Sequence, residues 1–236
     1  MKRFPPRREN QDEVAPSAAQ APARAPIVGR RATLEPVDPA RHTEGLFRAG
    51  HDGEGAAAIW DYLAYGPFPD AAAYGTWLEA AARSGDPLYF AIRLDDGRPA
   101  GIVSYLNIHP GNASIEIGHI WLAPFLQRTP AATEALFLAM RAAFDELGYR
   151  RLEWKCNALN QKSRAAALRL GFAFEGIFYR HMIVKGRNRD TAWFSLLAEE
   201  WPLVRDCFET WLDPANFDAE GGQKTSLGKL TRALRA

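Results

Sequence analysis

Apolar residues recur along the chain in short runs and alternations that predict β-strands. Asp96-Gly97 separates the two apolar runs of "LYFAIRLDDGRPAGIVSYLNI", which is a strong β-hairpin signal. A second turn, "HPGNA", leads into a strand over 114–122, so three antiparallel strands are expected in succession. Further strands are predicted at 28–38, 151–157, 174–185 and 190–197.

Apolar side chains at helical spacing predict helices between these strands. The segment 131–147 has such a stripe and ends at Gly148, a common helix stop. A C-terminal helix at 199–212 is expected to dock an apolar stripe on the same or a neighbouring subunit. That stripe consists of Trp201, Val204, Phe208 and Trp211. The other predicted helices span 39–49, 71–85 and 160–172.

Composition and charge place the chain among ordinary globular proteins. Its 236 residues, 47% hydrophobic and with a formal net charge of +1, suffice for one large α/β domain. The near-neutral balance argues against a dedicated nucleic-acid surface, and no run approaches the ~20 apolar residues that a membrane span needs. The 2 cysteines suit a reducing compartment, so a cytoplasmic protein is expected.

Composition also divides the chain into one domain and two tails. Residues 1–26 are rich in proline, alanine and arginine and contain no apolar run, which predicts a flexible tail rather than a secretory signal. A single domain is expected over 27–213, including the C-terminal helix. Residues 214–236 are predicted to form a polar, basic tail.

The segment "LQRTPAATEA", residues 126–135, joins a strand to a helix and is a candidate anion cradle. The first N–H groups of a helix lack intrahelical partners and favour a negative ligand. Pro130 has no N–H, but five backbone donors surround it, and the Arg128 and Thr133 side chains would add phosphate contacts. Those donors are Arg128, Thr129, Ala131, Ala132 and Thr133. An ordinary strand–helix connection is the alternative.

Four segments, in order, resemble the GNAT superfamily of acyl-CoA-dependent N-acyltransferases, and most closely its ribosomal-protein alanine N-acetyltransferases. They are "LEPVDPARHTEGLF", "IEIGHIWLAPFLQRTPAATEAL", "NALNQKSRAAALRLGF" and "RDTAWFSLLAEEW". The resemblance covers roughly 27–203 and implies an α/β (α+β) fold. Its central sheet is expected to be mixed, mostly antiparallel, of about seven strands, and flanked by helices. The implied reaction moves an acetyl group from acetyl-CoA to a primary amine without a covalent enzyme intermediate.

The resemblance assigns part of the chain to acetyl-CoA. Gln127 and Ala132 fit the family's pyrophosphate-loop pattern, whereas Pro130 stands where the family has its central glycine. The backbone of the preceding strand resembles the segment that pairs with the pantetheine arm. The residues concerned are Ile120, Trp121 and Leu122. The resemblance calls for no metal ion.

Asn160 and Ser163 match the family's Asn-x-x-Ser, which lies beside the acyl thioester. A helix N-cap followed by a first-turn polar residue is an alternative interpretation, compatible with the first. Many GNAT enzymes have a tyrosine four residues after that serine, and it protonates the leaving thiolate. Here that position is Ala167, so Ser163 or water is the candidate acid, unless the thiolate leaves unprotonated.

Acetyl transfer also needs a base, because amines near neutral pH are mostly protonated. Glu116 lies four residues before Ile120, where the superfamily often has its glutamate base. Strand alternation places both residues on one face, with His119 on the other. A solvent-facing glutamate is the alternative, and Glu153 is a second candidate base.

The acceptor amine is expected near "IWDYLAYGPF". An aromatic wall with one carboxylate would suit a cationic amine, although a small hydrophobic cluster under a loop is as good an interpretation. The wall would consist of Trp60, Asp61, Tyr62 and Tyr65, with Arg180 opposite. Arg180 would favour an acceptor that also carries a carboxylate or phosphate.

Three functions follow from these features. The leading one is N-acetylation of a small-molecule amine or a protein N-terminus. A non-catalytic acyl-CoA-binding module is the second, because Pro130 and Ala167 depart from the family pattern. The third is an interaction domain that forms a homodimer through the C-terminal apolar stripe.

Overall fold

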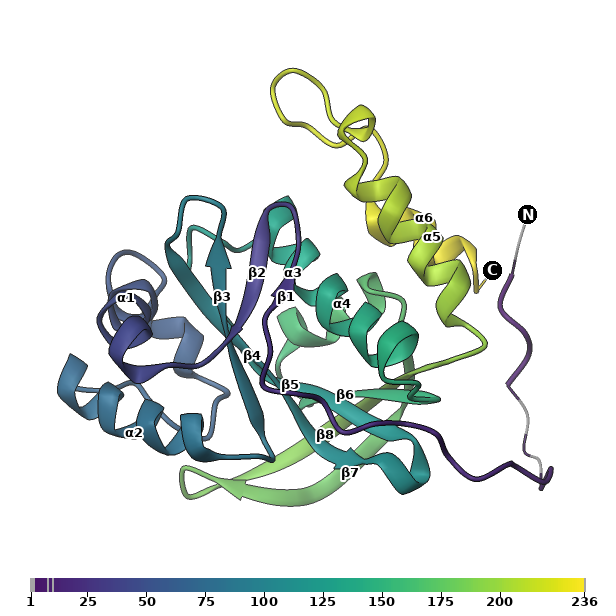
Figure 1. Cartoon of the computed structure of the whole chain (residues 1–236), viewed down its shortest axis with the longest axis horizontal. Helices are drawn as coiled ribbons and strands as arrows, with labels where there is room; N and C mark the ends of the chain where they lie inside the picture. The colour runs from purple at the N-terminus through teal and green to yellow at the C-terminus, as the bar shows by residue number, and fades with distance from the viewer. Residues whose placement is uncertain (1–2, 8, 10, 236) are drawn as a thin grey trace. The chain divides into compact units, whose positions relative to one another are not determined.

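The computed structural model of the protein describes residues 3–7, 9 and 11–235 (Figure 1). Contacts divide this part of the chain into two compact units. The first unit comprises 21–108 and 115–143. The second unit comprises the described residues up to 20, together with 109–114 and those from 144 onward.

Five strands form the sheet of the first unit in chain order. They are β1 (Ile27–Val28), β2 (Ala32–Pro36), β3 (Leu88–Leu94), β4 (Pro99–His109) and β5 (Ser114–Leu122). Antiparallel pairing joins β1 to β2, β2 to β3 and β3 to β4. The predicted hairpin is confirmed: Gly97, at a φ of +88°, donates its N–H to Leu94 O at 3.0 Å.

Three helices belong to the first unit: α1 (Pro39–His51), α2 (Ala71–Arg83) and α3 (Pro130–Arg141). Asp38 and Asp70 cap α1 and α2, since each carboxylate accepts a first-turn N–H. The short 3-10 helix η1 (Ala57–Trp60) lies between α1 and α2. The helix predicted at 131–147 ends earlier, because residues 142–146 continue as a wider π-helical turn.

The second unit contains the strands β6 (Arg151–Asn157), β7 (Ala173–Val184) and β8 (Arg187–Leu197), paired antiparallel in the order β6-β8-β7. Leu152, Trp154 and Cys156 alternate with more exposed residues along β6 and are buried. Burial also raises the pKa of the Cys156 thiol, as expected of a structural cysteine. The turn between β7 and β8 is tighter than predicted, because Lys185 and Gly186 both adopt positive φ and close a two-residue hairpin.

The helices α4 (Gln161–Arg169), α5 (Trp201–Leu212) and α6 (Leu227–Ala233) complete the second unit, with the 3-10 turns Pro110–Asn112 and Pro214–Asn216. The predicted apolar stripe of α5 is buried within this chain. The Trp201 ring stacks on Phe144, and its Nε1 donates to Asp145 Oδ1 at 2.6 Å. The prediction of a polar tail at 214–236 misses α6, which lies beside α5 in Figure 1 and packs on α4 and α5. Leu227 of α6 is buried.

Part of the N-terminal segment also contacts the second unit. Phe4 N donates to Leu234 O at 2.9 Å, and the Arg235 guanidinium lies 4.4 Å from the Phe4 ring centre. Arg7 donates to both carboxylate oxygens of Glu200, at 2.8 and 2.6 Å, and to Ser195 Oγ at 2.9 Å. These contacts differ from the expectation of a wholly flexible tail at 1–26, and composition alone could not indicate them.

A buried ionic cluster links β2 to α1 in the first unit. Glu35 accepts hydrogen bonds from Arg93 at 2.7 Å and Arg41 at 2.8 Å. The His42 Nδ1 accepts from the Asp38 N–H at 3.0 Å, so its Nε2 carries the proton and donates to Glu35 Oε2 at 3.2 Å. Burial lowers the pKa of His42 despite the neighbouring carboxylate. Burial alone would raise the pKa of Glu35, but the Arg93 and His42 hydrogen bonds outweigh it and the pKa is lowered.

This cluster predicts acid sensitivity in two stages. The pKa values of His42 and Glu35 are both lowered by folding, so each group binds fewer protons in the folded than in the unfolded state. The free energy of unfolding should therefore fall as the pH drops below about 6.5, where His42 titrates in the unfolded chain, and fall further below about 4.5, where Glu35 does. Urea unfolding at a series of pH values measures this. In His42→Gln the first stage should be smaller, because the titrating imidazole is gone. If the free energy of unfolding of that variant still fell as steeply with pH between about 6.5 and 5 as that of the wild type, the assignment to His42 would be contradicted.

Candidate functional site

The predicted cradle is a strand, a tight turn and the capped start of α3. Gln127 and Thr129 donate their N–H groups to Ala123 O and Leu126 O, which closes the turn after β5. Arg128 adopts a φ of +64° and is exposed. Thr129 is the N-cap of α3, and Pro130 occupies its first turn, where a missing N–H costs nothing.

The five predicted backbone donors are not equally available. Thr129 donates to Leu126 O, Ala132 to Thr129 Oγ1 and Thr133 to Thr129 O. Among the residues that the structure describes, the N–H groups of Arg128 and Ala131 have no hydrogen-bond acceptor. The Thr133 hydroxyl is buried and donates to Thr129 O at 3.4 Å. Of the five predicted donors, the N–H groups of Arg128 and Ala131 are therefore the free ones, and they lie at the positive end of the α3 dipole.

The extended backbone of β5 is broken at His119, just before residues 120–122, which are expected to pair with the pantetheine arm. His119 adopts a φ of +50°, a left-handed conformation inside an otherwise extended strand. The alternation counted from sequence does not continue through such a residue, so it no longer puts Glu116 and Ile120 on one face. Trp121 is buried against Trp60, with 5.6 Å between ring centres, whereas Ile120 and Leu122 are partly exposed. Leu122 O accepts from the Gln127 side chain at 3.0 Å.

Glu116 is buried, with 4% of its surface exposed. The alternative of a solvent-facing glutamate is therefore wrong. Its Oε2 accepts from the Asn107 side-chain amide at 2.7 Å. The carboxylate occupies the same strand as the cofactor segment, three residues before His119.

Glu153, the second candidate base, lies on β6 in an ionic network. Its carboxylate contacts Arg151 at 2.8 Å and Lys155 at 2.8 Å. Burial raises the pKa of Glu153, but the hydrogen bonds from Lys155 and Arg151 outweigh burial and lower it. A carboxylate held in its charged form in this way is a weaker base than one without cations beside it.

Asn160 and Ser163 occupy the start of α4. Asn160 Oδ1 accepts the Ser163 N–H at 3.0 Å, so the N-cap interpretation holds. Ser163 Oγ accepts from Trp154 Nε1 at 3.0 Å, and the Ser163 side chain also hydrogen-bonds the Cys156 thiol. Ala167 is fully buried.

The four residues predicted as an acceptor wall have different environments. Trp60 is a core residue, 1% exposed, and donates its Nε1 hydrogen to Gly50 O at 2.9 Å. It cannot contact an acceptor, so the hydrophobic-cluster alternative describes it correctly. Asp61 and Tyr62 are exposed. Tyr65 is partly buried, and its ring stacks on Trp77 with 4.4 Å between centres.

Arg180 belongs to the second unit, on β7. It is exposed, adopts a φ of +51° and donates its N–H to Asp190 Oδ1 at 2.7 Å. The register between β7 and β8 shifts around it, between Phe178 and Met182. The structure therefore places Arg180 on a bulged part of the hairpin that β7 and β8 form.

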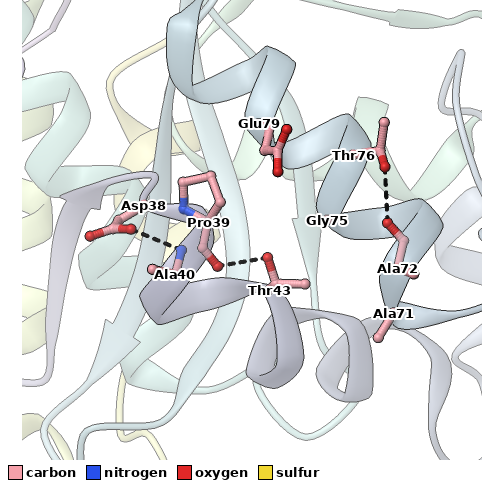
Figure 2. Close-up of a pocket in the computed structure, with 9 residues that line it drawn as sticks. All are labelled: Asp38, Pro39, Ala40, Thr43, Ala71, Ala72, Gly75, Thr76 and Glu79. Atoms are coloured by element: carbon pink, nitrogen blue, oxygen red, sulfur yellow. Dashed lines mark hydrogen bonds between the residues drawn. The ribbon is translucent and has the colours of Figure 1, made fainter.

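A cavity of about 600 Å³ lies between the start of α1 and α2 (Figure 2). Three of its polar side chains make hydrogen bonds: Asp38 accepts from Ala40 N, Thr43 donates to Pro39 O and Thr76 donates to Ala72 O. None of the predicted site residues lines it. The cavity is therefore separate from the cradle and from the acceptor segment.

No helix within 3–7, 9 and 11–235 is long and apolar enough to cross a membrane. In the same residues, no three His, Cys, Asp or Glu side chains gather in a way that could hold a metal ion.

Comparisons with known proteins address the family. Residues 31–173 match the family described as "Acetyltransferase (GNAT) domain". The chain is 34% identical over 108 residues to the "Putative ribosomal N-acetyltransferase YdaF" of Bacillus subtilis (strain 168). That alignment covers 46% of this chain and 58% of the relative, so the chain spans less than two thirds of that protein.

Two solved structures have the same fold and substantial sequence identity. A GCN5-related N-acetyltransferase from Brucella melitensis is 45% identical, with a TM-score of 0.89 over 92% of this chain and 98% of that one. A probable acetyltransferase (GNAT family) from Chromobacterium violaceum ATCC 12472 is 40% identical, with a TM-score of 0.75 over 84% and 99%. The predicted fold is thereby confirmed, and the chain belongs to the GNAT acetyltransferase family.

Proposed function

We propose that this protein is an N-acetyltransferase that uses acetyl-CoA to acetylate a primary amine of a small molecule or a protein N-terminus. The observation that carries the proposal is the start of α3. There, the Arg128 and Ala131 N–H groups have no acceptor among the described residues, and the Arg128 side chain is exposed beside them. These donors suit a pyrophosphate even though Pro130 supplies none.

The other proposed cofactor contacts follow from binding of the pyrophosphate at the start of α3. Gln127 and Thr129 shape the turn, and Ala132 and Thr133 start the helix behind it. The pantetheine arm would run back along β5, beside the backbone of Leu122, Trp121 and Ile120. In the second unit, Asn160 caps the start of α4, whose first turn carries the Ser163 hydroxyl.

Acetyl-CoA brings the activated acetyl group, as a thioester. The amine nitrogen attacks the thioester carbon, an N–C bond forms, the C–S bond breaks and the amine gives up one proton. We assign the proton to Glu116, because it is a carboxyl side chain buried on β5, the strand beside which the thioester would lie. Ser163, as a proposed donor to the departing sulfur, takes the role that Ala167 cannot fill.

Two sources of primary amine are candidate acceptors: a small molecule and a protein N-terminus. The name of the Bacillus relative is the reason to test protein N-termini, and the exposed Asp61 and Tyr62 suit any cationic amine. Arg180 is proposed to contact an acidic group of the acceptor. Release of thiol from acetyl-CoA, measured across small amines and N-terminal peptides, tests the activity directly.

Binding and turnover separate catalysis from simple cofactor binding. Millimolar CoA should raise the melting temperature by mass action if the cradle binds it. A thermal shift with no thiol release across the panel would favour the non-catalytic module. The absence of both a shift and calorimetric binding would refute the proposed function.

Arg128→Ala is expected to weaken CoA binding through the phosphates. Loss of a charge-assisted hydrogen bond costs roughly 1.5–3 kcal/mol, which is about one to two decades in Kd. Calorimetry with CoA measures the loss, and the dephosphorylated pantetheine fragment is the control because it lacks the phosphates. Equal affinities of the variant and the wild type for CoA would show that Arg128 points elsewhere.

A further inference from the structure

Aromatic residues gather beside the interrupted part of β5. The Tyr65 ring stacks on His119, with 5.6 Å between centres and an interplanar angle of 18°, and on Trp77 at 4.4 Å. Tyr89 of β3 lies 5.2 Å from the His119 ring. These residues come from four separate segments of the first unit, and they meet at the one left-handed residue of β5.

The Tyr65 hydroxyl is buried and has no hydrogen-bond partner among the described residues. Native proteins rarely leave such a group unpaired, and a ligand is one of the few explanations for it. Burial raises the pKa of Tyr65 well above its ordinary value. The hydroxyl therefore keeps its hydrogen at physiological pH and can donate it to an acceptor atom.

The Tyr74 hydroxyl is also buried and unpaired among the described residues, but its surroundings differ. The Tyr74 ring packs against Phe47, His51, Phe68 and Trp77. Ring contacts with His119 are made by Tyr65 and Tyr89. Tyr65 is therefore the unpaired phenol that stacks directly on a side chain of β5.

If acetyl-CoA lies along β5 as proposed, its thioester end points toward the Tyr65 hydroxyl. The pyrophosphate would lie after β5, at Arg128, and the arm would follow Leu122 to Ile120. The next residue along that path is His119, on which Tyr65 stacks. Tyr65 itself lies in the irregular segment 61–70.

Building on the proposed function, we propose that the Tyr65 hydroxyl donates a hydrogen bond to a carbonyl-type oxygen of the bound reactants. Two sources share this chemistry: the thioester carbonyl of acetyl-CoA, and a carbonyl or carboxylate of the acceptor amine. In either case Tyr65 positions the reactants and takes no proton.

Tyr65→Phe tests the proposal, because it keeps the ring stacking and removes only the hydroxyl. Without ligand, the variant should melt at or above the wild-type temperature, since no internal hydrogen bond is lost. If the oxygen is the thioester carbonyl, calorimetry should show about three- to tenfold weaker binding of acetyl-CoA and unchanged binding of CoA, which lacks that carbonyl. If the oxygen belongs to the acceptor, the affinities for CoA and acetyl-CoA should both stay at the wild-type value, and the KM for the amine should rise by about three- to tenfold.

Tyr74→Phe is the matched control, and it should change none of these quantities by more than twofold. A lower melting temperature of unliganded Tyr65→Phe would show that the hydroxyl is bonded within the protein and would overturn the proposal. Equal weakening of CoA and acetyl-CoA, or no effect on either ligand or on the amine, would overturn it as well. Failure of the wild-type protein to bind CoA and acetyl-CoA would instead remove the proposed function.

Discussion

A Glu116→Gln variant is expected to release thiol from acetyl-CoA about 10²- to 10⁴-fold more slowly than the wild type at pH 7, with CoA affinity unchanged. Glutamine preserves the shape of the buried side chain and its capacity to accept from Asn107, but it is not basic. Steady-state kinetics with saturating amine measure the difference. The deficit should shrink as the pH rises toward the pKa of the amine, because free amine then exists without help.

Glu153→Gln is the matched control for this experiment. Its carboxylate is engaged by Arg151 and Lys155, so its loss should leave the turnover number within a few-fold of the wild type. A Glu116→Gln enzyme with near-normal turnover, together with a slow Glu153→Gln enzyme, would transfer the role to Glu153. A deficit that does not change with pH would mean that Glu116 positions the substrate only.

Arg7→Ala is expected to destabilise the protein by about 2–4 kcal/mol, because it leaves a buried carboxylate without its main partner. Glu200 is 1% exposed and receives two hydrogen bonds from Arg7. We expect less than the full effect of a buried pair, since the Arg7 side chain is 28% exposed and Arg235 stays 3.9 Å from Glu200. Urea denaturation measures the change in the free energy of unfolding.

Arg3→Ala serves as the control, because Arg3 is exposed in the same N-terminal segment. It should alter the free energy of unfolding by less than about 0.5 kcal/mol. Equal stability of Arg7→Ala and the wild type would mean that the segment around Arg7 does not contribute to the fold in solution.

Local sequence signals predicted the parts of the fold that local physics determines. Asp96-Gly97 specified a hairpin, and Asn160 and Gly171 bounded α4, because turns and caps depend on a few neighbouring residues. The α6 helix was missed because its buried face is short and gains stability from α4 and α5, which are distant in sequence. The pairing of Arg7 with Glu200, 193 residues away, has no local signal either.

The candidate site was predictable in its residues more than in its geometry. The cradle was located from the strand, Thr129 and the α3 stripe, but the number of free N–H groups depended on bonds inside the turn. The left-handed His119 has no signature in sequence, so the strand phase of Glu116 could not be carried through to Ile120. The aromatic residues near 60 were identified as a group, and only packing separated the core residue Trp60 from Tyr65.

The hydrogen bond from Phe4 to Leu234 has a consequence for the connectivity of the chain. Phe4 and Leu234 lie against each other in the second unit, so a short linker from Leu234 to Phe4 would connect these two segments covalently. New ends opened at the exposed Asp95–Gly97 turn would then give a circularly permuted protein. In such a permutant Arg7 and Glu200 would be separated along the chain by residues 201–234, the linker and residues 4–6, instead of by 193 positions.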